Sequence, residues 1–112
     1  MISLQLIKEE RKRQIESKGY DDKHDDDHDH DELINAAQCY LEHVSLKSHI
    51  MLLQDYYDNK LKLYRDVKRP KTWPKTWPPE SWNPDSPIRD LVKAAALIAA
   101  EIDRRLRIPD AF

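Results

Sequence analysis

Carboxylate and imidazole side chains dominate the stretch from Glu10 to Leu33, which reads ERKRQIESKGYDDKHDDDHDHDEL. So many like charges repel one another unless a positive group lies among them or solvent screens them. A divalent cation or a basic neighbouring helix would provide that positive group. Magnesium needs only one or two carboxylates besides waters and ligand phosphates, and Glu10 and Glu32 are its candidate ligands here.

The histidines of the same stretch suggest a second metal chemistry. His24, His28 and Glu32 are spaced by four residues, which would align them on a helix that began early. Imidazole with carboxylate suits zinc, manganese or iron, so His28 is a further metal candidate and a transition metal at His24 and His28 is an alternative to magnesium. Six aspartates among the ten residues 21–30 equally fit a solvated loop, or an acidic surface that imitates nucleic acid and binds a basic protein.

Polar side chains also fall on the predicted buried face of a first helix. Glu10 and Gln14 lie between apolar positions on the helical wheel, and Arg11 lies on the apolar stripe itself. Buried polar groups are costly unless paired, so the pattern indicates either a ligand site or a structural network of ion pairs. In a ligand site, Glu10 would hold the metal and Arg11 or Arg13 would meet a phosphate. Gln14 would be a further ligand contact.

Residues 70–87 read PKTWPKTWPPESWNPDSP and hold a tandem KTWP repeat with all three tryptophans. The prolines exclude a regular helix and predict an irregular, largely extended connection. Trp77 or Trp82 could stack on a nucleobase while a neighbouring lysine meets a phosphate. The alternative is that the tryptophans fill the core of a small domain.

The elements that must position these side chains are predicted to be helices, because the chain has one glycine and its prolines are concentrated in one segment. The predicted fold is all-α: a single domain over residues 1–112, built as a small bundle of three to four helices. The first helix is predicted over 3–18 and ended by Gly19, and the second over 30–44 with Asp29 and Glu32 as a capping box. A third is predicted over 46–64, either continuing the second or hinged near 45–48, and a last from Pro87 up to Pro109, capped by Ser86.

Apolar spacing predicts which face of each helix is buried. The residues predicted to face the core are Leu4, Ile7 and Ile15 on the first helix, Leu33, Ala37, Tyr40, Leu41 and Val44 on the second, and Ile88, Leu91, Ala95, Ile98 and Ile102 on the last. The opposite face of the last helix, predicted to meet solvent or another subunit, carries Asp90, Lys93, Leu97, Glu101 and Arg104. From this face Lys93 is a further candidate for ligand binding.

Composition narrows the class of protein. Charged residues make up 36% of the chain but the net charge is only −2, which argues against the broad basic surface of a duplex-DNA binder. The single cysteine, the absence of a long apolar run and the early charges predict a soluble cytoplasmic protein without disulfide or membrane span. Alanine-rich and aromatic faces that exceed what so short a chain can cover predict a homo-oligomer. One glycine leaves no room for a P-loop.

Both ends of the chain resemble a family of small uncharacterised proteins of phages and prophages. The matching residues are Glu10-Arg11-x-Arg13-Gln14-Ile15-Glu16, Gly19-Tyr20, His24-Asp25-Asp26-x-His28 and Glu32-Leu33, then the tryptophan- and proline-rich connection and the helix Arg89-Asp90-Leu91-Val92-Lys93-Ala94-Ala95-Ala96-Leu97-Ile98. The resemblance implies a protein located in the cytoplasm of a bacterial host and is silent about activity.

More distantly, the helical layout resembles the MazG-type nucleoside triphosphate pyrophosphohydrolases, which bind magnesium with acidic residues from adjacent helices. This resemblance implies a nucleotide ligand and magnesium-dependent cleavage between the α and β phosphates of a nucleoside triphosphate, with Glu10 and Glu32 in the place of metal ligands. Where that superfamily has Glu-x-x-Asp on its later helix, this chain has Asp90-x-x-Lys93, which replaces a metal ligand with a cation. The alternative function is a noncatalytic phage anti-defence protein that sequesters a nucleotide signal, such as a cyclic nucleotide, or binds and inhibits a bacterial defence protein.

Overall fold

The computed structural model of the chain describes residues 1–19, 23, 31–53 and 64–108, and for 47–53 it describes the backbone alone. Within these ranges the regular structure is helical and contains no strand. The elements are α1 (Ile2–Lys18), α3 (Glu32–Leu53), the 3-10 turn η1 (Pro79–Ser81) and α5 (Pro87–Arg107). The predicted all-α bundle, with its tryptophan-rich connection before the last helix, is therefore confirmed. No helix in the described ranges has the length and hydropathy needed to cross a bilayer.

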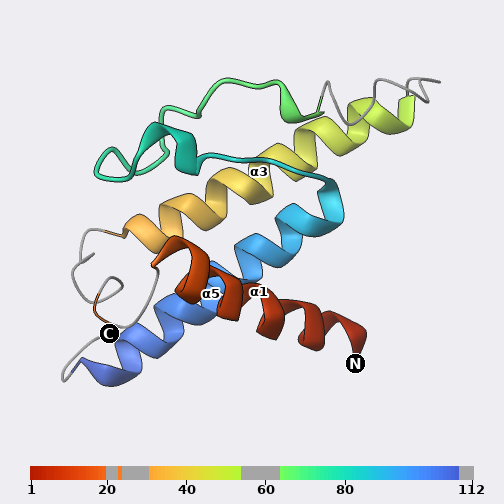
Figure 1. Ribbon diagram of the computed structural model, residues 1–112. Coiled ribbons are helices and arrows are strands. Elements are labelled where there is room, and N and C mark those ends of the chain that lie inside the picture. Colours follow the sequence, from red (N-terminus) through yellow and green to blue (C-terminus); the bar gives the residue numbers. More distant parts are fainter. Residues whose placement is uncertain (20–22, 24–30, 54–63, 109–112) are drawn as a thin grey trace.

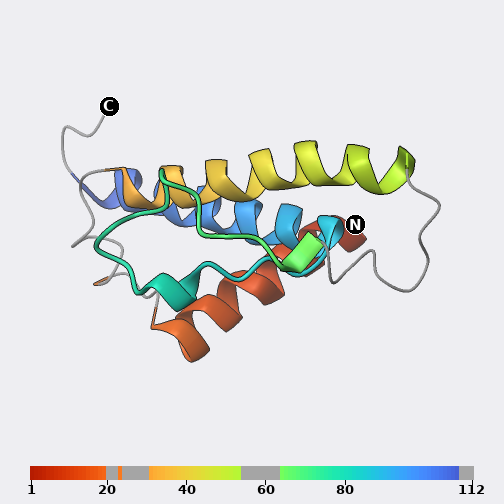
Figure 2. The ribbon, with the colours of Figure 1, turned by 90° about the horizontal axis from the view of Figure 1, so that it is seen from above.

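Helix α5 is the centre of the fold and packs against both α3 and α1. Helices α3 and α5 run antiparallel beside each other, and α1 crosses α5 (Figure 1). The connection from residue 64 to residue 86 lies on the same side of the α3 and α5 pair as α1 (Figure 2). The hydrophobic core is formed by residues of α3, of the connection and of α5.

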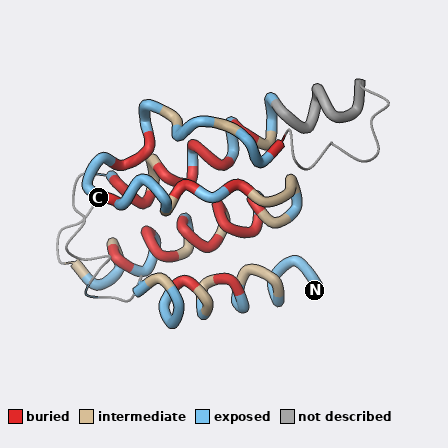
Figure 3. The backbone as a smooth tube through the Cα atoms, turned by 45° about the horizontal axis from the view of Figure 1, so that its top comes forward, coloured by how far each residue is buried: buried red, intermediate tan, exposed pale blue. Residues whose placement is uncertain are grey.

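Helix α1 ends as predicted but buries a different face. Gly19 adopts the left-handed conformation at φ 72°, and its N–H donates to the Gln14 carbonyl. The predicted apolar stripe was wrong for this helix, because Leu4 is 62% exposed and Ile15 is 39% exposed. The buried residues of α1 are Glu10 and Gln14 (Figure 3).

Helix α3 begins later than predicted and runs on without a hinge through 45–48. It starts at Glu32, and the N–H of Asn35 donates to the Asp31 carbonyl at 2.8 Å. The predicted capping box required Glu32 to be the third residue of the helix, but it is the first. Asp29, the other member of that box, lies outside the described residues, as do 54–63 of the predicted third helix. The inward residues include the predicted Leu33, Ala37 and Tyr40, whereas Leu41 is 41% exposed and was wrongly placed in the core.

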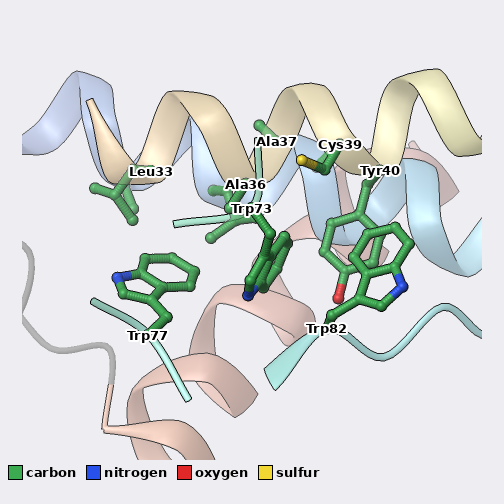
Figure 4. Packing of buried hydrophobic residues seen from close by; sticks show 11 residues of the cluster. Leu33, Ala36, Ala37, Cys39, Tyr40, Trp73, Trp77 and Trp82 are labelled. Carbon is green, nitrogen blue, oxygen red and sulfur yellow. The ribbon is translucent and has the colours of Figure 1, made fainter. Parts of the chain in front are cut away.

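The KTWP repeat produces the same turn twice. The N–H of Trp73 donates to the Pro70 carbonyl at 3.1 Å, and the N–H of Trp77 donates to the Pro74 carbonyl at 3.2 Å. The indoles of Trp73 and Trp77 consequently meet edge to face, with centroids 5.6 Å apart. Together with Trp82 they lie beneath α3 beside Tyr40 (Figure 4). All three tryptophans are buried, which confirms the core-filling interpretation.

Helix α5 begins as predicted, with Pro87 at its first turn and the Ser86 hydroxyl accepting from the N–H of Arg89 at 3.4 Å. The faces of α5 are the reverse of the prediction. The residues Asp90, Lys93, Leu97, Glu101 and Arg104 are buried, whereas Ile88, Leu91, Ile98 and Ile102 are between 44% and 68% exposed.

The reversal of α5 has a physical cause. Ala94 and Ala100 are completely buried, and their small side chains let the neighbouring helices approach closely. The charged residues on the same face are paired. Arg104, for example, donates to both oxygens of Glu101, at 2.5 and 3.1 Å. Close backbone packing and matched ion pairs therefore determine which face of α5 is buried, and the burial of its larger aliphatic side chains does not.

Candidate anion-binding site

The carboxylate of Glu10 is the fixed point of the site, because its side chain is wholly buried and lies between two arginines. Arg13 donates to it from Nε and from Nη2, each at 2.7 Å, and Arg89 donates from Nη2 at 2.6 Å. Gln14 Nε2 completes the set at 3.2 Å. Burial would raise the pKa of Glu10, but these hydrogen bonds and the two positive charges outweigh it and lower the pKa.

Two lysines add positive charge to the same region. Burial lowers the pKa of Lys18, and the nearby charges of Arg13 and Lys93 lower it further. Burial also lowers the pKa of Lys93, although Asp90 opposes this shift. Lys93 Nζ donates to the Asn83 carbonyl at 2.7 Å and lies 5.6 Å from the centre of the Tyr40 ring. The lysines therefore repel neighbouring cations, and this repulsion weakens if an anion binds.

Asp90 anchors the far side of the cluster. It is completely buried, accepts a hydrogen bond from the Tyr64 hydroxyl at 2.6 Å, and lies 3.7 Å from Lys93 Nζ. The backbone N–H of Asp85 also donates to Asp90, at 2.9 and 3.2 Å to its two oxygens. Burial and the hydrogen bond to Asp90 raise the pKa of Tyr64, so the phenol remains protonated and keeps donating. This network fixes the first turn of α5, and with it Arg89.

Gln14 faces a small pocket between α1, α5 and the connection. Its side chain is buried, and its Oε1 has no hydrogen-bond partner among the described residues. The cavity encloses about 10 Å³, which is room for one water molecule. Its lining residues are Glu10, Arg13, Gln14, Lys18, Tyr40, Trp73, Trp77, Ser81, Lys93 and Leu97. Arg13 lines the pocket, and Arg89 reaches it through its hydrogen bond to Glu10; we call these two arginines the rim, and their side chains remain 39% and 35% exposed.

The structure brings together some of the predicted site residues and separates others. Arg13, Gln14, Trp77 and Lys93 line the pocket with Glu10, whereas Trp82 and Arg11 do not. Trp82 stacks on Tyr40 with centroids 4.9 Å apart. Glu32 lines a different hollow, which is formed with Asn35 of α3 and with Lys71, Thr72, Trp73, Pro74, Lys75 and Thr76 of the two repeats. The predicted ligands His24 and His28 lie outside the described residues.

The arrangement of Glu10 does not suit a magnesium ligand. A carboxylate offers about four lone-pair positions, and four donors of Arg13, Arg89 and Gln14 occupy those of Glu10. Glu32, the other proposed ligand, belongs to another hollow. The described residues contain no group of three or more potential metal ligands. The donor set therefore fits a carboxylate that holds arginines.

Sequence reasoning missed Arg89, Lys18 and Asp90 as members of the site. Arg89 and Glu10 are 79 positions apart, so no local spacing could connect them. A weak signal existed for Asp90, since an acidic residue in the first turn of a helix is favourable. Lys18 gave none, because a basic residue in the last turn of a helix is expected in any case.

Comparisons of the chain with protein-family models, with curated proteins and with solved structures found no match. Its function must therefore be inferred from the geometry of the site.

We expect the stability of the fold to fall in acid. Ion pairs and hydrogen bonds lower the pKa of both Glu10 and Glu101 below the ordinary value of 4.5, after outweighing the effect of burial. Their stabilisation is therefore complete above about pH 4.5 and is lost as the pH falls through the lower folded-state values. Urea unfolding between pH 7 and pH 3 should show this loss. The loss of stability in acid should be smaller in the double variant Glu10→Gln/Glu101→Gln, and in the exposed control Glu16→Gln it should equal that of the wild type. An equal loss in the wild type, the double variant and the control would contradict the assignment.

Proposed function

We propose that the protein binds a small phosphorylated ligand of the nucleotide class at the rim formed by Arg13 and Arg89, and holds it without hydrolysis. One observation carries the proposal: a single buried carboxylate fixes two guanidinium groups at 2.6 to 2.7 Å while about a third of each arginine side chain stays exposed. Such arginines are positioned in advance and still accessible to an anion.

Charge supports an anionic ligand. Around the pocket lie four cationic side chains, Arg13, Lys18, Arg89 and Lys93, against the carboxylates of Glu10 and Asp90. Burial lowers the pKa of Lys18, and the nearby charges of Arg13 and Lys93 lower it further. A phosphate with two negative charges would offset this excess, and the planar guanidinium matches phosphate geometry.

The buried amide supports a ligand that carries more than phosphate. Gln14 Oε1 is an acceptor that lacks a donor among the described residues, and it lies beside the cations. The enclosed space holds only one water, so the ligand itself binds at the rim and a water links its N–H or O–H group to this amide. A nucleotide or cyclic nucleotide presents both kinds of group close together.

Binding without turnover follows from the donor set. The lone pairs of Glu10 are engaged by Arg13, Arg89 and Gln14. Under the resemblance to the MazG-type enzymes, Lys93 takes the place of a metal ligand. The proposed biological consequence is sequestration of a nucleotide signal, in line with the resemblance to phage proteins.

Calorimetric titration in the presence of EDTA tests the proposal. The probes are inorganic phosphate, pyrophosphate, nucleoside mono- and triphosphates and cyclic dinucleotides. We expect at least one nucleotide to bind more tightly than phosphate, and Arg13→Gln and Arg89→Gln each to weaken it roughly 10- to 100-fold, because each removes a charge-assisted hydrogen bond. The matched control is Lys12→Gln, an exposed cation next to Arg13 in sequence, which should leave the affinity unchanged.

Two results would overturn the proposal. One is the absence of binding for every probe by a folded protein. The other is an equal loss of affinity in Arg13→Gln, Arg89→Gln and Lys12→Gln, which would indicate general attraction of anions to a basic surface. Because Arg13 and Arg89 also pair with Glu10, the melting temperature of each variant is measured alongside the titration.

A further inference from the structure

The outward face of α5 is apolar along its whole length. We define the outer α5 stripe as Ile88, Leu91, Ala95, Ile98 and Ile102; its four larger side chains are between 44% and 68% exposed, and Leu106 beside the end of the stripe is 79% exposed. Scattered exposed aliphatic residues are ordinary, but a contiguous row of them on a monomer marks an interaction surface.

A groove extends the stripe sideways onto α3. It has a volume of about 280 Å³, and Ile34, Ala37 and Leu41 of α3 line it together with Ile98 and Ile102. Leu41 is itself 41% exposed. The apolar surface is thus wider than one helix, and from Ile88 to Ile102 it extends about 21 Å along α5. A surface of that length across two helices is of the order of the roughly 600 Å² per partner at the lower limit of specific protein interfaces.

The spacing of the stripe identifies the shape of its partner. Its members follow one another at intervals of three, four, three and four residues, which is the heptad pattern of a helix that packs along another helix. Ala95 near the middle leaves room for a close approach.

We propose that the partner is a second copy of this chain, with the two outer α5 stripes packed antiparallel about a twofold axis. In this register Leu91 lies opposite Ile102 of the partner subunit, and Ala95 lies opposite Ile98 of the partner subunit. The small side chain of Ala95 in each subunit therefore meets the larger side chain of Ile98 in the other subunit. An isologous interface requires this kind of self-complementarity.

The antiparallel register also brings Arg105, which pairs with Glu101 of its own chain at 3.1 Å, close to the start of α5 of the partner subunit. The aliphatic stem of Arg105 there covers Ile88 of the partner subunit, which is otherwise 68% exposed.

Sedimentation velocity of the full chain over a range of concentrations tests the dimer. We expect a dimer for the wild type, and a dissociation constant at least about 100-fold higher for Ile98→Glu, because two unpaired charges enter the apolar interface. The matched control Leu4→Glu replaces another exposed aliphatic residue, on α1 and outside the stripe, and should leave the dimer intact. A monomer at all concentrations, or a dimer that Ile98→Glu does not weaken, would overturn the proposal. Circular dichroism confirms that each variant is folded.

Disulfide trapping tests the direction of packing. In a Cys39→Ser background, a mixture of Ile88→Cys and Arg105→Cys proteins should form a cross-linked dimer on oxidation, whereas Ile88→Cys alone should not. Serine at position 39 can keep the contact that the Cys39 thiol makes with the Thr72 hydroxyl at 3.2 Å. Efficient cross-linking of Ile88→Cys with itself would show parallel packing and overturn the antiparallel arrangement.

Discussion

Trp73→Ala should destabilise the fold by about 3–5 kcal/mol, the usual cost of deleting a large buried aromatic side chain. Trp73 is 3% exposed and touches three other aromatic rings, with centroids 5.6 Å away for Tyr40, 5.6 Å for Trp77 and 5.2 Å for Trp82. Its Nε1 also donates to the Ser81 hydroxyl at 3.0 Å. Removing the indole therefore opens a cavity between the connection and α3, and urea unfolding at pH 7 measures the cost.

Two further variants complete this test: one separates the packing of the Trp73 ring from its hydrogen bond to Ser81, and the other is a control at an exposed position. Trp73→Phe keeps most of the ring contacts and loses the hydrogen bond to Ser81, so its cost should be markedly smaller than that of alanine. Lys75→Ala changes an exposed residue of the second repeat and should leave stability within about 0.5 kcal/mol of the wild type. A cost below 1 kcal/mol for Trp73→Ala would show that the tryptophan cluster does not hold the fold together.

Glu10→Gln should lower the free energy of unfolding by about 2–3 kcal/mol and yet preserve phosphate binding. Breaking a fully buried ion pair costs about 3–5 kcal/mol, and the partial exposure of both arginines reduces this figure. The neutral amide still accepts hydrogen bonds, and it removes the negative charge that competes with a bound anion. Titration with pyrophosphate in EDTA should therefore give an affinity equal to or higher than that of the wild type.

The same variant distinguishes the two roles considered for Glu10. If Glu10 bound magnesium for catalysis, Glu10→Gln would abolish magnesium-dependent binding and any release of pyrophosphate from nucleoside triphosphates. A stable, folded Glu10→Gln protein that no longer bound the anion in EDTA would contradict the expectation that the neutral amide keeps Arg13 and Arg89 in place. Glu9→Gln, on the exposed side of the same helix turn, is the control.

The ends of the helices were predictable because local chemistry fixes them. Gly19 ends α1 in the left-handed conformation, and Ser86 with Pro87 starts α5. The burial of Glu10 and Gln14 was also visible, since both fall among apolar positions of the helical wheel. These features depend on residues within a few positions of each other.

The inner face of α5 was not predictable by the same reasoning. Apolar periodicity assumes that the largest aliphatic side chains face the core, but in α5 they face outward and alanines with paired charges face inward. One partner of Glu10 is Arg89, which lies 79 positions away in the sequence. Pairings of this kind depend on how helices cross, which the sequence pattern of one helix does not contain.

The most direct test of the anion site is a crystal structure of the protein soaked with pyrophosphate. We expect electron density for the anion within hydrogen-bonding distance of the Arg13 and Arg89 guanidinium groups, with both arginines still paired to Glu10. Anion density confined to other surfaces, with the rim between Arg13 and Arg89 filled by protein side chains at saturating pyrophosphate, would contradict it.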